Sequence, residues 1–239
     1  DFLKKNVKNF IRFFISIFKI LFKINGVISF LKRNGFSNVG YFNLKDWRND
    51  KFFIVACHVD FLGKVFIKCG KGDWLDKEFE ITKYVYENSK TKNTTNAIKL
   101  IRYNGFSFAI YKFIDGLPLD DFLNTGQNFD NLKVNGFISF VDNLNYLKII
   151  HRDVRPHNII VESSGVPIFI DFEHAVHVNE YLKNNMPLSA TDIPLRNNGY
   201  NNDYVWDDVS SLLKISEIFN LQDDELIDRL EERIGRNIL

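Results

Sequence analysis

Cysteine is scarce in this sequence of 239 residues, which contains only Cys57 and Cys69. Two cysteines cannot build a disulfide framework, and both lie in strand-like runs, so we expect buried free thiols in a reducing compartment. Long uninterrupted apolar runs are also missing. The apolar region near the N-terminus is broken by Arg12, Lys19 and Lys23, which argues against a cleavable signal peptide and against a membrane-spanning helix of about 20 residues.

Acidic side chains are absent from residues 2–45, although the net charge of the whole chain is only +1. Over residues 2–24, mostly basic side chains recur at spacings of three and four and draw a cationic stripe along a predicted helix. The stripe consists of Lys5, Lys8, Arg12, Ser16, Lys19 and Lys23. From residue 10 onward, Phe, Ile and Leu cover the rest of the cylinder. This helix fits an anionic membrane surface, and it fits equally well a covering by the protein's own body or by a second subunit. We assign residues 1–38 to this arm.

Strand-like patterns dominate the first half of the chain and helical patterns the second half, which predicts an α+β fold. Strands are predicted at residues 52–59, 64–69, 106–113, 159–162 and 167–171. Helices are predicted at residues 73–86, 119–123, 132–147, 207–219 and 223–234. Asp73 is the expected cap of the first of these helices. A turn at residues 115–118 separates two predicted lobes, residues 39–114 and residues 115–239.

One segment, HRDVRPHNIIV at residues 151–161, concentrates polar side chains whose spacing suits catalysis, and IFIDF follows at residues 168–172. A loop presents Asp153, and Asn158 opens a strand five residues later. A tight hairpin then returns the chain, so that Asp171 lies beside Asn158. A carboxylate and an amide oxygen placed together suit Mg²⁺ in the company of substrate phosphates. Asp153 is left to accept a proton from an attacking hydroxyl.

These motifs resemble the catalytic loop H-R-D-x-x-x-x-N and the D-F-G motif of protein kinases and their relatives, in the same order and at a similar separation. The resemblance covers about residues 50–220. It implies a bilobal protein-kinase-like fold, with ATP as the phosphate donor and with Mg²⁺ or Mn²⁺ held by Asn158 and Asp171. It also implies that Asp153 is the catalytic base and that Arg155 stabilises charge on the transferring group.

Other landmarks follow from the same resemblance. VFIK at residues 65–68 resembles the V-A-I-K strand, whose lysine, here Lys68, contacts the ATP phosphates. Glu78 matches the helix glutamate that pairs with this lysine, and Glu80 competes for that role. Asp208 resembles the aspartate that braces the catalytic loop. YKFIDG at residues 111–116 resembles the hinge, whose backbone meets adenine, and Lys112, Phe113 and Ile114 are its expected contact residues.

The chain departs from protein kinases in three places. A Gly-rich loop G-x-G-x-x-G is absent, Glu173 replaces the glycine of D-F-G, and no A-P-E motif follows. Glutamate at that place is familiar from choline and aminoglycoside kinases, and the short C-terminal half resembles compact bacterial sugar and lipopolysaccharide-core kinases. We therefore expect a kinase for a sugar hydroxyl of a cell-surface glycan or lipopolysaccharide precursor. Its expected location is the cytoplasm, at the inner face of the cell membrane.

Two alternatives remain open at this point. A small Ser/Thr protein kinase would phosphorylate peptides, and a nucleotide-binding pseudokinase would bind partners without catalysis. The missing Gly-rich loop favours the pseudokinase, whereas the complete set of catalytic residues opposes it. The net charge of +1 and the lack of an interleaved basic and aromatic pattern predict no nucleic-acid partner. His174 and His177 form a weak metal-site candidate, His151 is expected to pack in the core, and the oligomeric state is undetermined.

Overall fold

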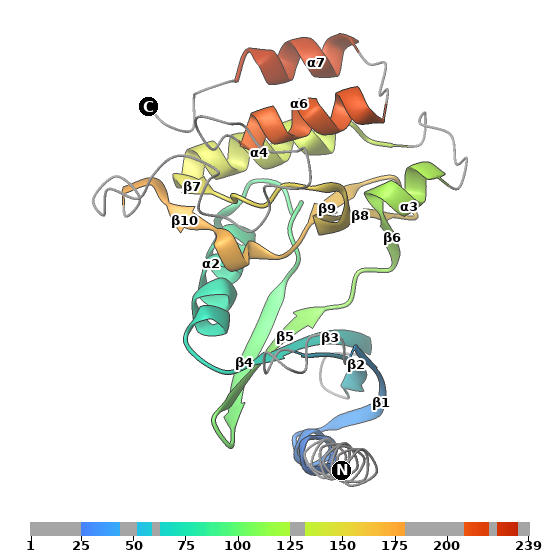
Figure 1. Ribbon diagram of the computed structural model, residues 1–239, viewed down its shortest axis with the longest axis vertical. Helices are drawn as coiled ribbons and strands as arrows, with labels where there is room; N and C mark the ends of the chain where they lie inside the picture. The colour runs from blue at the N-terminus through green and yellow to red at the C-terminus, as the bar shows by residue number, and fades with distance from the viewer. Residues whose placement is uncertain are drawn as a thin grey trace, which may run out of the picture.

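The computed structural model describes residues 25–43, 52–58, 63–124, 132–179, 208–219 and 224–233. Figure 1 shows a lobe rich in β-strands and a lobe rich in α-helices, which confirms the predicted bilobal α+β fold class. The predicted helix at residues 2–24 lies outside the described residues. Among the helices that are described, none has both the length and the apolar character that a bilayer span requires.

The first lobe is built on a five-stranded antiparallel sheet in the order β1-β2-β3-β5-β4. Its strands are β1 (Phe36–Asn43), β2 (Phe52–His58), β3 (Gly63–Gly70), β4 (Ala97–Tyr103) and β5 (Phe106–Lys112). The sequence patterns indicate β2, β3 and β5 but not the two edge strands. In β1, Asn38 has a positive φ and the register shifts beside Gly40, while β4 alternates poorly between buried and exposed side chains.

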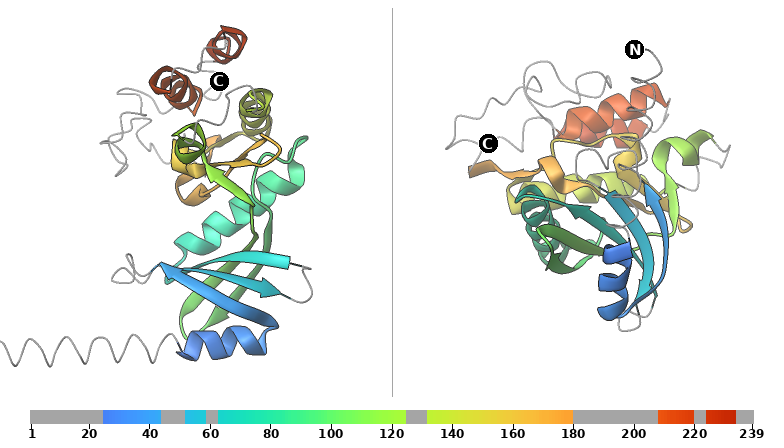
Figure 2. Two further views of the ribbon diagram at one scale, coloured as in Figure 1. Left: turned by 90° about the vertical axis from the view of Figure 1, so that its right-hand side faces the viewer. Right: turned by 60° about the horizontal axis from the view of Figure 1, so that its bottom comes forward.

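The two faces of this sheet are covered by different helices. Residues 25–33 form a helix whose Val27 and Leu31 pack with Ile54 and Ile67 on one face. Figure 2 shows this helix against the sheet, on the side away from α2. Helix α2 (Trp74–Asn88) covers the opposite face. Residues 25–38, which the sequence analysis groups with the arm, are therefore part of the sheet's own packing.

The start of α2 differs from the prediction. Asp73 precedes the helix, but its side chain makes no capping hydrogen bond, because its backbone is already helical at φ −81° and ψ −8°. The indole of Trp74 fixes this end instead. Trp74 Nε1 donates to the carbonyl of Lys71 at 2.7 Å, and the ring fills the space where a side chain at Gly70 would stand. Only glycine at position 70 admits this close approach.

Both cysteines are free, as predicted. Cys69 on β3 is fully buried, and burial raises the pKa of its thiol well above the ordinary value. Cys57 on β2 is only half-buried, so the predicted burial is correct for one of the two thiols.

The second lobe surrounds a large apolar core. Its elements are β6 (Gly116–Pro118), α3 (Leu119–Asn124), α4 (Asn135–Leu147), β7 (Ile149–Ile150), β8 (Ile159–Glu162), β9 (Pro167–Phe169), β10 (Val176–His177), α6 (Asp208–Ile218) and α7 (Asp224–Glu231). The rings of Phe140 and Phe169 stack at a centroid distance of 3.5 Å, and Phe137 meets Phe169 edge-on. This packing ties α4 to the β8–β9 hairpin, which presents the polar residues of the site.

A second connection joins the lobes besides the chain at residues 113–115. The loop after α2 is attached to α4 through the buried side chain of Asn143. Its amide nitrogen donates to the hydroxyl and the carbonyl of Thr91, and its oxygen accepts from the backbone N–H of Lys90. The C-terminal end of α2 is therefore anchored on the second lobe, which limits how far this helix can swing.

Candidate active site

Asp208, the first residue of α6, supports the candidate catalytic loop at residues 151–158. One carboxylate oxygen of Asp208 accepts from the backbone N–H of His151 at 2.7 Å, and the other accepts from that of Arg152 at 3.0 Å. Asp208 is fully buried, and Arg152 has a positive φ of 67°. The structure thus places Asp208 at the bracing position that the resemblance implies, where it holds a strained loop in shape.

His151 is a packing residue, as predicted. Its ring is fully buried, meets Phe172 edge-on at 4.4 Å between centroids, and bonds the carbonyl of Ile170 through Nε2. The backbone N–H of Asp153 donates to His151 Nδ1. Burial lowers the pKa of His151 to about 4, so the ring is neutral at pH 7. A neutral ring accepts from Asp153 and carries no charge into the core.

Asp153 lies at the centre of a small polar network. The Asn158 amide donates to one Asp153 carboxylate oxygen at 2.8 Å and to the Asp153 carbonyl at 3.0 Å. Arg155 Nε lies 2.8 Å from the other oxygen. Burial raises the pKa of Asp153 to about 7, against the opposing effect of the Arg155 guanidinium. A carboxylate with a pKa near the working pH suits a general base.

The β8–β9 hairpin brings Asp171 to Asn158, as its length predicts. Ile159 pairs with Phe169, and the backbone N–H of Ile170 donates to the carbonyl of Asn158 at 2.9 Å. Asp171 follows directly, in the left-handed conformation at φ 65°. The two side chains nevertheless turn to different partners, Asn158 to Asp153 and Asp171 to Lys68. The backbone proximity is confirmed, and a shared metal between them stays a prediction.

Lys68 is surrounded by three carboxyl groups from two lobes. Its ammonium lies 2.7 Å from Glu78, 2.8 Å from Asp171 and 3.5 Å from Glu173. The pairing with Glu78 rather than Glu80 agrees with the sequence analysis, since Glu78 is buried and Glu80 is exposed. Burial alone would lower the pKa of Lys68, but Glu78 and then Asp171 outweigh it and raise the pKa above its ordinary value. Lys68 is therefore charged at neutral pH.

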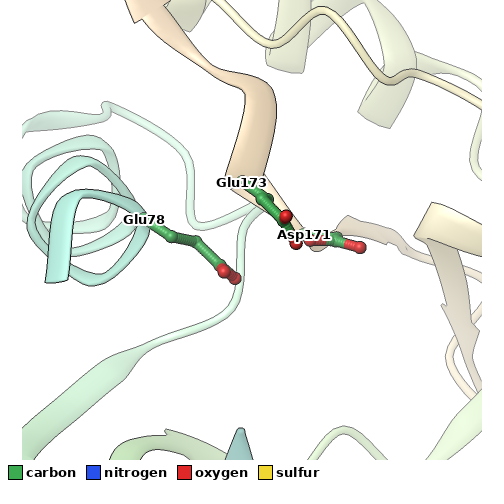
Figure 3. Close-up of side chains that lie close together, drawn as sticks. All are labelled: Glu78, Asp171 and Glu173. Atoms are coloured by element: carbon green, nitrogen blue, oxygen red, sulfur yellow. The ribbon is translucent and has the colours of Figure 1, made fainter. Parts of the chain in front are cut away.

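The carboxylates around Lys68 have the chemistry of a divalent-cation site. Glu78, Asp171 and Glu173 each offer an oxygen, and these oxygens lie within 4.8 Å of one another. Figure 3 shows the three side chains together, Glu78 from α2 and the other two from the segment after β9. Hard oxygen donors of this kind fit Mg²⁺ or Mn²⁺. Within the described residues, His174 and His177 belong to no such cluster of three ligands.

A cavity of about 220 Å³ opens between the lobes beside these groups. Lys68, Glu78 and Asp171 line it together with apolar side chains and with all three predicted hinge residues, Lys112, Phe113 and Ile114. Two of the hinge's backbone donors are already engaged, because Lys112 N–H donates to Asn96 and Phe113 N–H to Lys64. The structure thus places the hinge at the cavity wall, with two of its three backbone N–H groups already paired.

The sequence analysis did not predict the roles of Glu173, Phe53 and Phe66 in the site, or the contact that Tyr111 of the hinge segment makes there. Glu173 reaches Lys68, and Tyr111 donates its hydroxyl to Glu78 at 3.5 Å. Phe53 and Phe66 line the cavity from the sheet. Alternation along β3 signals that Phe66 shares a face with Lys68, two residues on. The positions of Phe53 and Tyr111 depend on strand register, which sequence does not state.

Comparison with known proteins gives limited support to a kinase-like site. No family model matches the chain. Over 83 residues the chain is 34% identical to a probable cell division protein kinase of Encephalitozoon cuniculi (strain GB-M1). This protein is similar to a kinase. The match covers 34% of the chain and 31% of the relative, so it spans about a third of that protein's length. It supports a kinase-like relationship, and such a relationship generally implies ATP and Mg²⁺.

Proposed function

We propose that this chain transfers the γ-phosphate of ATP to a hydroxyl group. The observation that carries the proposal is the convergence of a charged lysine, the buried Glu78, the half-buried Asp171 and a cavity at one place between two lobes. The apolar part of the cavity suits a base, and Lys68 suits the phosphates. Bound Mg²⁺ would neutralise phosphate charge; Asp171 and Asn158 are the residues that the resemblance assigns to it, and Glu173 offers a further oxygen beside Asp171.

The proton of the acceptor hydroxyl goes to Asp153. This carboxylate is held by Asn158 and Arg155, so its orientation is set before the acceptor arrives. Its pKa of about 7 lets it take a proton at neutral pH without being permanently protonated. Arg155 lies beside it and supplies positive charge where the transferring group accumulates negative charge. Asp208 keeps this loop in the required shape.

For the acceptor we propose a sugar hydroxyl of a cell-surface glycan or glycolipid precursor. Glu173 supports this choice, because an acidic residue after Asp171-Phe172 is typical of small-molecule kinases and because its carboxylate here belongs to the Lys68 cluster. The likeness to a probable cell division protein kinase supports a second candidate, a protein hydroxyl. We propose that residues 2–24 hold the enzyme at an anionic membrane surface, where a glycolipid would be presented.

The test is transfer of labelled γ-phosphate from Mg·ATP into a lysate that is afterwards separated into glycolipid and protein fractions. The blank is Asp153→Asn, which preserves shape but cannot accept the proton, so its rate should be about 10² to 10⁴ times lower. Label in the glycolipid fraction that is lost with the variant supports the sugar acceptor. Label only in protein supports the second candidate. Equal label with both forms contradicts phosphotransfer by this site and leaves a nucleotide-binding pseudokinase.

A further inference from the structure

Two aromatic rings, those of Phe53 and Phe66, line the sheet side of the cavity and are called its roof here. Protein kinases carry a small residue at one of these two positions, the alanine of V-A-I-K. Phe66 stands at the alanine position of that motif, two residues before Lys68 on β3. Phe53 lies on β2 opposite Lys68. The two rings stack at a centroid distance of 5.6 Å with an interplanar angle of 21°, and both line the cavity. Both are half-buried, so part of each ring remains accessible from the cavity.

The strand pairing shows where the roof lies relative to the hinge and to Lys68. Phe66 pairs across the sheet with Tyr111, next to the hinge, whereas Lys68 pairs with Ala109, farther from it. The apolar side chains Ile160 and Ile170 line the cavity from the second lobe. A flat ligand that entered beside the hinge would therefore lie between Phe66 and these isoleucines. A charged group attached to it would extend toward Lys68 and Phe53.

The hinge itself has part of its hydrogen-bonding capacity already used. Of its three backbone N–H groups, those of Lys112 and Phe113 bond to the carbonyls of Asn96 and Lys64. The hydroxyl of Thr95 also approaches the Lys112 carbonyl, at 3.4 Å. Two donors that could recognise a base are thus occupied, so contact with the apolar and aromatic side chains of the cavity gains weight.

We propose that Phe66, assisted by Phe53, binds the nucleobase of ATP by aromatic stacking and adds base affinity to that of a partly engaged hinge. This inference rests on the proposed function. Stacking accepts any base, because every base has a π-face. The site is therefore expected to bind Mg·GTP within a few-fold of Mg·ATP. Stacking on Phe66 would also offset part of the affinity that a G-x-G-x-x-G loop supplies in protein kinases, because it adds a contact to the base.

The experiment is calorimetric titration of the full chain with three probes: Mg·ATP, adenosine and inorganic tripolyphosphate. Phe66→Ala should weaken binding of Mg·ATP and adenosine by about tenfold or more, the range that loss of one base–aromatic stack produces, and should leave tripolyphosphate unchanged. Phe66→Leu should lose almost as much, because it keeps apolar volume without a π-face. Phe66→Tyr should bind like the parent. Phe106→Ala is the matched control, because Phe106 belongs to the same sheet but packs on the opposite face.

Each outcome separates this inference from the proposed function. If Phe66→Ala binds Mg·ATP as tightly as the parent or tighter, the ring fills the base site instead of stacking, and the inference is overturned while phosphotransfer stands. The inference is also overturned if Phe66→Leu matches Phe66→Tyr, since volume then matters and aromaticity does not. A folded parent that binds none of the three probes contradicts both. Loss of tripolyphosphate binding in Phe66→Ala, with Phe106→Ala unaffected, likewise contradicts the inference, because a base contact cannot act on that probe.

Discussion

Asp208 supports the catalytic loop, and the loss of unfolding free energy in its variants can be predicted from the structure. Asp208 is fully buried and accepts two backbone hydrogen bonds, from His151 at 2.7 Å and from Arg152 at 3.0 Å. A hydrogen bond to a charged group contributes about 1.5–3 kcal/mol, and each buried donor left without a partner costs a similar amount. Asp208→Ala should therefore lower the free energy of unfolding by about 3–6 kcal/mol. Asp208→Asn keeps one acceptor oxygen and should cost about half of this.

A matched control is available at the surface of the same lobe. Asp142 on α4 also accepts two hydrogen bonds, from Arg233 at 2.7 and 3.1 Å, but its side chain is 51% exposed. Exposed ion pairs contribute at most about 1 kcal/mol. Urea denaturation followed by circular dichroism at pH 7 compares the two sites directly. Asp208→Ala and Asp142→Ala with equal unfolding midpoints would refute the brace.

The same variants test the link from the brace to function. Arg152 is held at a positive φ, a conformation that costs a non-glycine residue roughly 1–3 kcal/mol, and Asp208 holds it there. Without the brace the loop relaxes, so kcat for phosphotransfer should fall at least tenfold in Asp208→Asn. The Kd for Mg·ATP should change little, because Lys68 and the cavity lie on another part of the site. A variant with normal kcat and a raised Kd would contradict this route of action.

Three further predictions concern charge. Because burial raises the pKa of Asp153 to about 7 and the base must be ionised, kcat/KM should rise with pH up to about 7 and then level off. In Arg155→Met the loss of the cation should raise this pKa and move the rise to higher pH. A pH profile that does not move would show that Asp153 is not the group that titrates. Glu78→Gln should raise the KM for ATP several-fold with a smaller change in kcat, since Lys68 loses its closest partner; unchanged steady-state kinetics would count against the pairing. Replacing the four lysines of residues 2–24 that lie in the cationic stripe by glutamine should abolish sedimentation with anionic vesicles but not ATP binding, and continued sedimentation would contradict the membrane contact.

The sequence predicts those parts of the site in which one short segment contains the functional residues and also determines which of them lie close together. The HRD segment and the following hairpin place Asp153, Asn158 and Asp171 because a four-residue strand and a tight turn allow little choice of register. Lys68 and Glu78 follow from the resemblance, because VFIK matches the V-A-I-K strand and Glu78 matches the glutamate that pairs with its lysine. Asp208 is also correctly placed, because a resemblance supplies the long-range contact that local pattern does not.

The other features of the site and fold depend on contacts between segments that are distant in the sequence, which a local sequence pattern does not predict. A one-residue shift between β2 and β3 would turn Phe53 to the other face, so its stacking on Phe66 cannot be read from the sequence. The cap at Asp73 fails for a related reason: the ring of Trp74, packed on Gly70, sets the start of α2. The approach of Glu173 to Lys68 likewise requires the left-handed turn at Asp171.

The charge balance around Lys68 argues that this arrangement serves binding rather than stability. Three carboxyl groups face one ammonium, and Glu78 and Lys68 are both buried. A buried ion pair seldom stabilises a fold more than apolar residues of the same size would, and additional carboxylates beside it repel one another. The surface pair of Asp142 and Arg233, by contrast, is balanced one to one. An excess of acid next to a cavity is most favourable once a divalent cation enters with its phosphates, which is the state in which the proposed reaction takes place.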